Sequence, residues 1–313
     1  MTCEPLIPVI IGPTAGGKTS LSIRVAELLS QHTGRTAEII SADSVQIYRG
    51  LDIGSAKPTP EERRGFTHHL IDIIDPDQPY TVHQWLTDAD RCIEDIRSRK
   101  GAPIVVGGTH LYIKALLDGL FQGPPPDPDL RAQLTARSLA ELRTELERVD
   151  PVTAARVHPN DLRRTVRALE VFSQTGTPIS TLQSQWDREH PRRTDLRIFA
   201  LLWPSSLINR RINQRVRDMI ENGLVEEVQS LLPRLGEQSR QALGYKQIAQ
   251  ALAGKISLEQ AIEQIKIETR RFAKNQRTWL KRLACAPNFQ GIQLTDSPGE
   301  EHAQLIVQQC LRE

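Results

Sequence analysis

The sequence predicts an α/β fold, in which helices flank a parallel sheet and a wholly helical segment interrupts the chain. Three observations support this prediction. A glycine-rich segment separates a strand-length apolar run from a helical pattern near the start of the chain, strand and helix patterns alternate over about the first 120 residues, and a proline-rich break precedes residues with helical periodicity and no strand pattern. Such alternation is typical of doubly wound parallel sheets.

The elements expected before the break alternate regularly. Segments of strand length and character occupy residues 6–11, 37–41, 69–74 and 103–106. Apolar residues near the helical period follow Lys18 and recur over 82–99 and 110–117. Asp75-Pro76 should end the third strand and Gly107-Gly108 the fourth, because these residue types terminate extended runs.

The break itself reads Gly-Pro-Pro-Pro-Asp-Pro over residues 123–128, which predicts a stiff linker. Helical periodicity then extends from 130 to about 186, a strand pattern returns at 196–202, and residues 208–283 are mostly helical in pattern. We therefore expect three parts: a first core segment at 1–122, a helical insertion at 123–194, and a return to the core with a basic helical region at 195–313.

Composition excludes several classes of protein. The formal net charge is only +2 over 313 residues, so a nucleic-acid surface would have to be a local patch. No apolar run approaches the roughly 20 residues of a membrane helix, and we expect no membrane partner and no signal peptide. Cys3, Cys92, Cys285 and Cys310 lack metal-binding or redox spacing, which favours a reduced, cytoplasmic protein. The sequence does not fix the oligomeric state, and a monomer is expected.

The glycine-rich segment fits the pattern G-x-x-x-x-G-K-[ST], and its flanks read as the strand and helix that this pattern requires. Its backbone N–H groups and the following helix N-terminus favour an anion, Lys18 adds a point charge, and the Thr19 hydroxyl can hold Mg²⁺. A chance glycine turn is the alternative. The sequence thus predicts a di- or triphosphate site in a P-loop NTPase-like fold, formed by Gly12, Pro13, Thr14, Ala15, Gly16, Gly17, Lys18 and Thr19.

The acidic residue expected near this site is in an unusual place. Proteins that transfer a γ-phosphoryl group usually hold Mg²⁺ with an acidic residue at the end of a neighbouring strand. Here the strand at 103–106 ends without one, and the carboxylate follows the second strand, as Asp43. Because strand C-termini face the ligand crevice in an open α/β sheet, we expect Asp43 to meet an acceptor rather than a metal. A role as a turn or cap residue is the alternative.

Several motifs together resemble one family, the tRNA dimethylallyltransferases (tRNA isopentenyltransferases). The resemblance covers nearly the whole chain, with the motifs in the family's order. They are the P-loop, then Asp43-Ser44-x-Gln46-x-Tyr48, Asp52-Ile53-Gly54-Ser55-Ala56-Lys57-Pro58, Gly107-Gly108-Thr109-x-Leu111-Tyr112, His158-Pro159-Asn160-Asp161, Gly244-Tyr245-Lys246 and Thr278-Trp279.

The resemblance implies prenyl transfer. Members move a dimethylallyl group from dimethylallyl diphosphate to the exocyclic N6 amine of the adenosine 3′ to the anticodon in tRNA, forming i6A and releasing diphosphate. By this resemblance Asp43 is the general base, Thr109 contacts the acceptor nucleotide, and Lys18 with a Thr19-held Mg²⁺ stabilises the diphosphate. The adenosine must be flipped out of the anticodon stem-loop to reach a buried carboxylate. As an alternative, Thr109 could cap the helix that follows it.

Two basic clusters are candidates for the tRNA surface. Arg270, Lys274, Arg277 and Lys281 follow helical spacing and form one stripe, although a merely solvated face is the alternative. Asn275 stands where the family commonly has a basic residue. Arg163, Arg164 and Arg167 form the second cluster, with structural ion pairs to Glu170 as the alternative. With the resemblance, the full set expected to contact tRNA is Asp43, Ser44, Val45, Gln46, Thr109, Arg131, Arg163, Arg164, Arg167, Tyr245, Arg270, Lys274, Gln276, Arg277 and Lys281.

Three other functions remain open from the sequence. An adenylate isopentenyltransferase would share the loop and the base, but a free nucleotide needs neither the helical insertion nor the basic stripe. A small-molecule kinase of the P-loop class would form ADP and release no diphosphate from a prenyl donor. A non-catalytic tRNA-binding protein would have no use for Lys18, Thr19 and Asp43 together.

Overall fold

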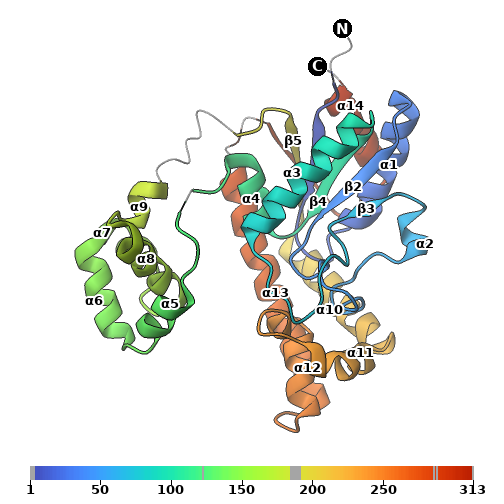
Figure 1. Cartoon of the computed structure of the whole chain (residues 1–313). Helices are drawn as coiled ribbons and strands as arrows, with labels where there is room; N and C mark the ends of the chain where they lie inside the picture. Colours follow the sequence, from blue (N-terminus) through green and yellow to red (C-terminus); the bar gives the residue numbers. More distant parts are fainter. Residues whose placement is uncertain (1–3, 122, 184–191, 285, 287, 312–313) are drawn as a thin grey trace. The chain divides into compact units, whose positions relative to one another are not determined.

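Six strands within the described residues form one sheet, and every neighbouring pair is parallel. The structure is a computed structural model that describes residues 4–121, 123–183, 192–284, 286 and 288–311. The order across the sheet is β3-β2-β4-β1-β5-β6 (Figure 1). The strands are β1 (Ile7–Ile11), β2 (Ala37–Ala42), β3 (His68–His69), β4 (Ala102–Gly107), β5 (Leu196–Leu202) and β6 (Phe289–Gln293). The predicted fold class, a parallel sheet flanked by helices, is confirmed.

The central strands form where the sequence is mostly apolar. Every residue of β1, β2 and β4 is buried, as expected for parallel strands that are covered on both faces. Ile10 of β1 is in register with Val106 of β4 on one side and with Phe199 of β5 on the other. The end of β1, where the glycine-rich loop begins, therefore lies between two neighbouring strand ends, which is where α/β sheets bind ligands.

Helices cover both faces of this sheet (Figure 1). On one face, α1 (Lys18–Thr33) and α14 (Glu300–Leu311) pack against each other and share a core with Ile10 and Phe199. On the other face, α3 (Val82–Ser98) contacts β2 and β4, and begins at Thr81, whose side chain completes a capping box. The remaining helices before the insertion are α2 (Pro60–Arg63) and α4 (His110–Asp118).

The insertion is a compact unit of its own, Leu117–Arg192, whereas Met1–Leu116 and Arg193–Glu313 together form the other unit. Its own core includes Leu142, Leu146 and Leu169. The expected helical periodicity is seen as far as residue 183, and residues 184–186 lie outside the described part. The helices of this unit are α5 (Pro128–Thr135), α6 (Leu139–Val149), α7 (Pro151–Arg156), α8 (Leu162–Thr175) and α9 (Ile179–Leu182).

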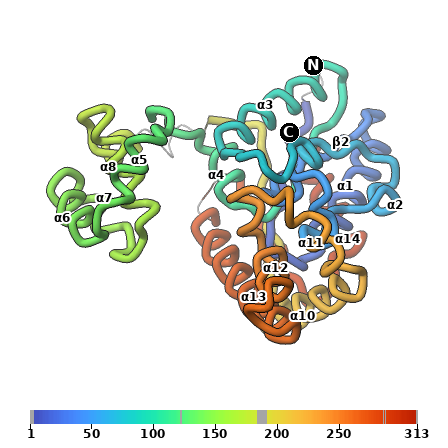
Figure 2. Tube along the Cα trace, turned by 60° about the horizontal axis from the view of Figure 1, so that its bottom comes forward, coloured from blue at the N-terminus to red at the C-terminus, as the bar shows by residue number. Residues whose placement is uncertain are grey.

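After β5, a helical region gathers at one end of the sheet (Figures 1 and 2). Its long helix α13 packs against both α10 and α12. The elements of this region are α10 (Ser205–Glu221), α11 (Leu224–Leu231), the 3-10 turns η2 (Leu232–Arg234) and η3 (Ser239–Gln241), α12 (Tyr245–Leu252) and α13 (Leu258–Leu283). Within the described residues, no helix combines the length and apolar character needed to span a bilayer.

One predicted strand is wrong. The run at 69–74 was expected to be extended, yet β3 ends at His69, and Leu70 and Asp72 adopt φ angles of 60° and 58°. Left-handed residues cannot continue a strand. The Lys57 ammonium donates to Tyr48 O at 3.0 Å and to Asp72 Oδ1 at 2.6 Å, which ties this turn to the preceding loop. The sequence analysis also missed β6 and α14.

Candidate active site

The glycine-rich loop connects β1 to α1 in a conformation that presents backbone amides. Ala15 and Gly17 have positive φ angles of 59° and 83°, and Gly16 N–H donates to Pro13 O at 3.1 Å. No side chain caps α1, so the first-turn amides remain free for an anion at the positive end of the helix dipole. This geometry is what the sequence motif requires.

The side chain of Lys18 folds back onto the phosphate loop. Its Nζ donates to Gly12 O at 3.2 Å and to Pro13 O at 2.9 Å. Burial, together with the positive charge of Arg215, lowers the pKa of Lys18 to about 8, although the carboxylate of Asp43 opposes the shift. Lys18 therefore titrates close to neutral pH, and an anion placed beside it would raise its pKa again.

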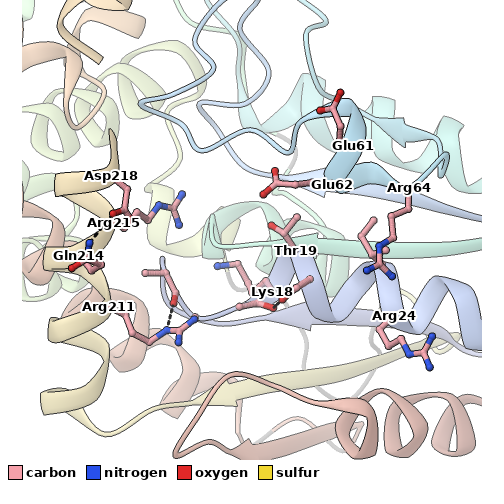
Figure 3. A pocket seen from close by; sticks show the side chains of 15 residues that line it. Lys18, Thr19, Arg24, Glu61, Glu62, Arg64, Arg211, Gln214, Arg215 and Asp218 are labelled. Atoms are coloured by element: carbon pink, nitrogen blue, oxygen red, sulfur yellow. Dashed lines mark hydrogen bonds between the residues drawn. The ribbon is translucent and has the colours of Figure 1, made fainter. Parts of the chain in front are cut away.

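A cavity of about 880 Å³ opens beside the loop and is rich in charged side chains. Figure 3 shows Lys18 and Thr19 between side chains of α10 on one side and Arg24 and Arg64 on the other. The cations are accompanied by Glu61, Glu62 and Asp218. An excess of fixed positive charge around a helix N-terminus is suited to a polyanionic ligand.

Arg215 is a site residue that the sequence analysis missed. It projects from α10, lines the cavity beside the loop, and is not hydrogen bonded to any described residue. Burial lowers the pKa of its guanidinium, and the negative charge of Asp43 partly restores it. A signal was present, because Arg211 and Arg215 are spaced to share one face of a helix that follows a strand end.

A second cavity, of about 310 Å³, lies at the ends of β2 and β4. Its polar part contains Thr14, Asp43, Ser44 and Thr109, and Arg215 borders both cavities. Its apolar wall comes from the C-terminal helices and the segment before α12, and includes Ile212, Val216, Met219, Leu243, Ile265 and Phe272. The cavity beside the phosphate loop and the cavity beside Asp43 therefore share one arginine.

Asp43 occupies both positions that the sequence analysis considered for it, in a turn and at a cavity. Its Oδ1 accepts from Val45 N at 2.9 Å and from Gln46 N at 3.3 Å, so the carboxylate closes the turn after β2. The same side chain lines the second cavity. Thr109 Oγ1 accepts from Ser44 N at 3.0 Å, which joins the ends of β4 and β2.

Gln46 and Val45 flank this turn. The Gln46 side chain accepts from Ser41 Oγ at 3.1 Å and donates to Ala56 O at 3.2 Å, which fixes the loop after the turn. Val45 lines the second cavity. The turn therefore combines one residue that stabilises the loop with one that faces the cavity.

Two residues expected to contact tRNA are buried instead. Gln276 accepts from Thr14 N at 2.8 Å and donates to Gly108 O at 2.9 Å, so it links α13 to the phosphate loop and to the end of β4. The Tyr245 hydroxyl donates to Glu227 Oε1 at 2.6 Å, and burial beside that carboxylate raises the pKa of Tyr245. Both side chains stabilise the site from within, because each bonds through its polar atoms to neighbouring protein groups.

The basic stripe of α13 divides into one paired residue and three others. Arg270 donates to Asn213 Oδ1 at 2.6 Å and lies 3.7 Å from Glu263 Oε1. Lys274 and Lys281 are exposed and Arg277 is half-buried; none of the three has an acidic partner within the described part of the chain. These three cations are therefore free of ion pairs with described residues and can bind an anionic ligand from solution.

In the insertion, too, some of the basic residues expected to contact tRNA form ion pairs with described residues and one does not. The carboxylate of Glu170 is fully buried and pairs with Arg131 at 2.9 Å and with Arg167 at 2.6 Å, and of the cluster at 163–167 only Arg167 forms the ion pair with Glu170 that was the structural alternative. Arg164 pairs with Asp161 at 3.1 Å at the start of α8. Arg163 is exposed and forms no interaction with a described residue.

Thr19 is the remaining predicted ligand, and it lines the larger cavity. No group of three or more His, Cys, Asp or Glu side chains is arranged for a metal ion within the described residues.

Comparison with known proteins identifies the family. The family model described as IPP transferase matches residues 46–283, and a second, Isopentenyl transferase, matches residues 5–78. A tRNA dimethylallyltransferase of Thermomicrobium roseum is 46% identical over 90% of this chain and 84% of its own length. Its counterpart from Thermotoga maritima is 44% identical over 88% and 89%, respectively.

Solved structures of similar proteins point to the same family. A tRNA isopentenylpyrophosphate transferase of Bacillus halodurans matches 97% of this chain and 95% of its own, at 36% identity and a TM-score of 0.68. A eukaryotic dimethylallyltransferase acting on tRNA matches 93% of this chain and 74% of its own, at 28% identity and a TM-score of 0.76. The first family model spans well over half of the chain, and the chain therefore belongs to the IPP transferase family, whose curated members similar to it are named tRNA dimethylallyltransferases.

Proposed function

We propose that this chain transfers a dimethylallyl group from dimethylallyl diphosphate to the exocyclic N6 amine of the adenosine 3′ to the anticodon in tRNA, releasing diphosphate. The observation that carries the proposal is the pair of cavities that share Arg215, one around the phosphate loop and one around Asp43. A donor whose diphosphate occupies the first cavity can present its prenyl carbon to an acceptor in the second.

The diphosphate is held at the loop by free amides, Lys18 and Arg215. As the bond between the prenyl carbon and the diphosphate oxygen breaks, negative charge accumulates on the leaving group, and cations fixed around the loop stabilise that charge. Mg²⁺ held by Thr19 would supply further charge neutralisation. The apolar wall of the second cavity, which includes Ile212 and Val216, suits a five-carbon prenyl tail.

The acceptor amine requires help because its lone pair is delocalised into the adenine ring. As its nitrogen bonds to the prenyl carbon, one N–H proton must leave, and the carboxylate of Asp43 accepts it. Oδ1 of Asp43 is committed to the turn, which leaves Oδ2 for the proton. Thr109, which is tied to Ser44 beside Asp43, would contact the flipped nucleotide.

The tRNA would be bound mainly through its phosphates. Lys274, Arg277 and Lys281 have no acidic partners among the described residues, and cations of this kind contribute sequence-independent affinity. Arg163 is the corresponding candidate in the insertion. Arg131 and Arg167 would act indirectly, by fixing the helices of the insertion through Glu170.

The decisive experiment is product analysis. The protein is incubated with labelled dimethylallyl diphosphate and either unmodified tRNA, AMP or a small-molecule hydroxyl acceptor, and the products are digested to nucleosides. We expect label only in N6-prenylated adenosine from tRNA. Label in AMP alone would support an adenylate isopentenyltransferase, and absence of label from every adenosine product would reject the proposal.

A further inference from the structure

Two side chains outside the glycine motif hold the phosphate loop by its carbonyl oxygens. Arg211 Nε donates to Ala15 O at 2.8 Å, as the dashed line in Figure 3 shows, and Trp203 Nε1 donates to Gly16 O at 3.2 Å. The Arg211 guanidinium lies over the Trp203 ring, 4.8 Å from its centre. The two donors are therefore coupled to each other as well as to the loop.

The segment between β6 and α14 supports this pair from outside. Ser297 Oγ accepts from Arg211 Nη1 at 3.0 Å. Pro298 presses on the loop at Gly17, where an added Cβ would lie 2.6 Å from Pro298 Cδ. At Gly16 an added Cβ would lie 2.8 Å from Pro13 O and 3.3 Å from Trp203 Nε1. We call Trp203, Arg211, Ser297 and Pro298 the loop brace.

The brace has a consequence for the loop amides. In a trans peptide the carbonyl oxygen and the next residue's N–H point in opposite directions. Holding Gly16 O against the Trp203 indole therefore turns the Gly17 N–H away from that indole. Holding Ala15 O at Arg211 likewise fixes the peptide of Gly16, whose N–H closes the internal turn on Pro13 O.

We propose that Trp203 and Arg211 are positioning residues, which hold the loop carbonyls back so that its amides are arranged for diphosphate before the donor binds. The inference rests on the proposed function for the identity of the anion. A loop held in its binding conformation loses less entropy when the ligand arrives, so the brace raises affinity for the diphosphate. Arg211 also lines the cavity. The test must therefore separate its hydrogen bond to the loop from the direct attraction of its charge for the anion.

The test measures binding of inorganic diphosphate with Mg²⁺ by calorimetry, on the full chain, without any prenyl chemistry. Trp203→Phe keeps an aromatic ring at this position and removes the five-membered ring that carries the Nε1 donor. Arg211→Lys keeps the charge and removes the Nε donor that holds Ala15. We expect each variant to bind diphosphate about tenfold more weakly, as the loss of one hydrogen bond to a loop carbonyl implies. The KM for the donor should rise similarly while tRNA affinity stays at the wild-type value.

Matched controls separate the brace from a general loss of stability. Trp85→Phe removes an equally buried indole whose Nε1 donates to Ser41 O at 3.0 Å, away from the loop. Arg210→Lys changes the preceding residue on α10, which is exposed and bonds to no described residue. Both controls should bind diphosphate as the wild type does.

Three results would overturn the inference. These are wild-type diphosphate affinity in Trp203→Phe, wild-type diphosphate affinity in Arg211→Lys, or a loss of diphosphate affinity in the controls as large as that in the two variants. If Trp203→Phe does not fold, the diphosphate affinity of Arg211→Lys decides whether the inference holds. The outcome is independent of the proposed function, because a protein that binds diphosphate through the brace yet prenylates no adenosine would refute only the latter.

Discussion

Replacing Asp43 by Asn and by Ala separates the two roles that its position allows. Oδ1 accepts two backbone N–H groups of the turn after β2, at 2.9 and 3.3 Å, and an Asn side chain offers the same acceptor. Asn cannot take a proton from the acceptor amine at neutral pH. The Asn variant should therefore keep the turn and lose the base, whereas the Ala variant should lose both.

The magnitudes follow from this division. Loss of a positioned base lowers kcat by about 10²–10⁴, or about 3–5 kcal/mol in the barrier. Loss of the two turn contacts in the Ala variant should cost a further 1–2 kcal/mol, approximately, in the free energy of unfolding. The KM for the donor should not rise in the Asn variant, because Asp43 is an anion near Lys18 and Arg215 and its removal favours a diphosphate.

The assay is steady-state formation of prenylated adenosine at saturating donor and tRNA, together with thermal unfolding of the three proteins. We expect a large loss of kcat in both variants and a loss of stability only with Ala. A near wild-type kcat for Asp43→Asn would refute the assignment of Asp43 as the base and leave it as a turn residue.

Four further outcomes are expected. Lys18→Ala and Thr19→Ala should raise the KM for the donor and leave tRNA affinity intact, and equal loss of tRNA binding in a folded variant would contradict a loop dedicated to the donor. Because the pKa of Lys18 is about 8 in the free protein, kcat/KM for the donor should fall as pH rises through about 8, and Lys18→Ala should abolish that limb of the profile. Arg215→Ala should weaken binding of inorganic diphosphate, and unchanged affinity would remove it from the donor site. The double change of Arg277 and Lys281 to Ala should weaken cognate and non-cognate tRNA alike and flatten the slope of log K against log salt by about one unit per contact; an unaltered slope would indicate a merely solvated face.

The sequence predicted elements whose signals are local. The strands β1, β2, β4 and β5 are mostly apolar in sequence, and each was located to within about a residue of its observed bounds. The phosphate loop is a contiguous motif, so its place in the chain could be predicted, whereas the contacts of Trp203 and Arg211 with its carbonyls could not. Residues 70–74 show the limit of this reasoning, because their apolar pattern suits a strand while Lys57 draws Asp72 into a left-handed turn.

Contacts between distant parts of the chain were not predictable in the same way. Gln276 lies among basic residues of a helix and resembles a surface position, yet its partner Thr14 is 262 residues away in sequence. Tyr245 is likewise buried by its pairing with Glu227. The edge strand β6 was missed because its sequence, FQGIQ, has little apolar character and it is defined by pairing with β5.

The most direct test of the account measures, in one reaction, the three products that its chemistry distinguishes. Purified protein is mixed with dimethylallyl diphosphate, unmodified tRNA and ATP, and the amounts of prenylated adenosine, diphosphate and inorganic phosphate are followed with time. We predict that prenylated adenosine and diphosphate appear in equal amounts and that no phosphate is released from ATP at a comparable rate. Phosphate release from ATP at enzyme-like rates without prenylated adenosine would contradict the central claim.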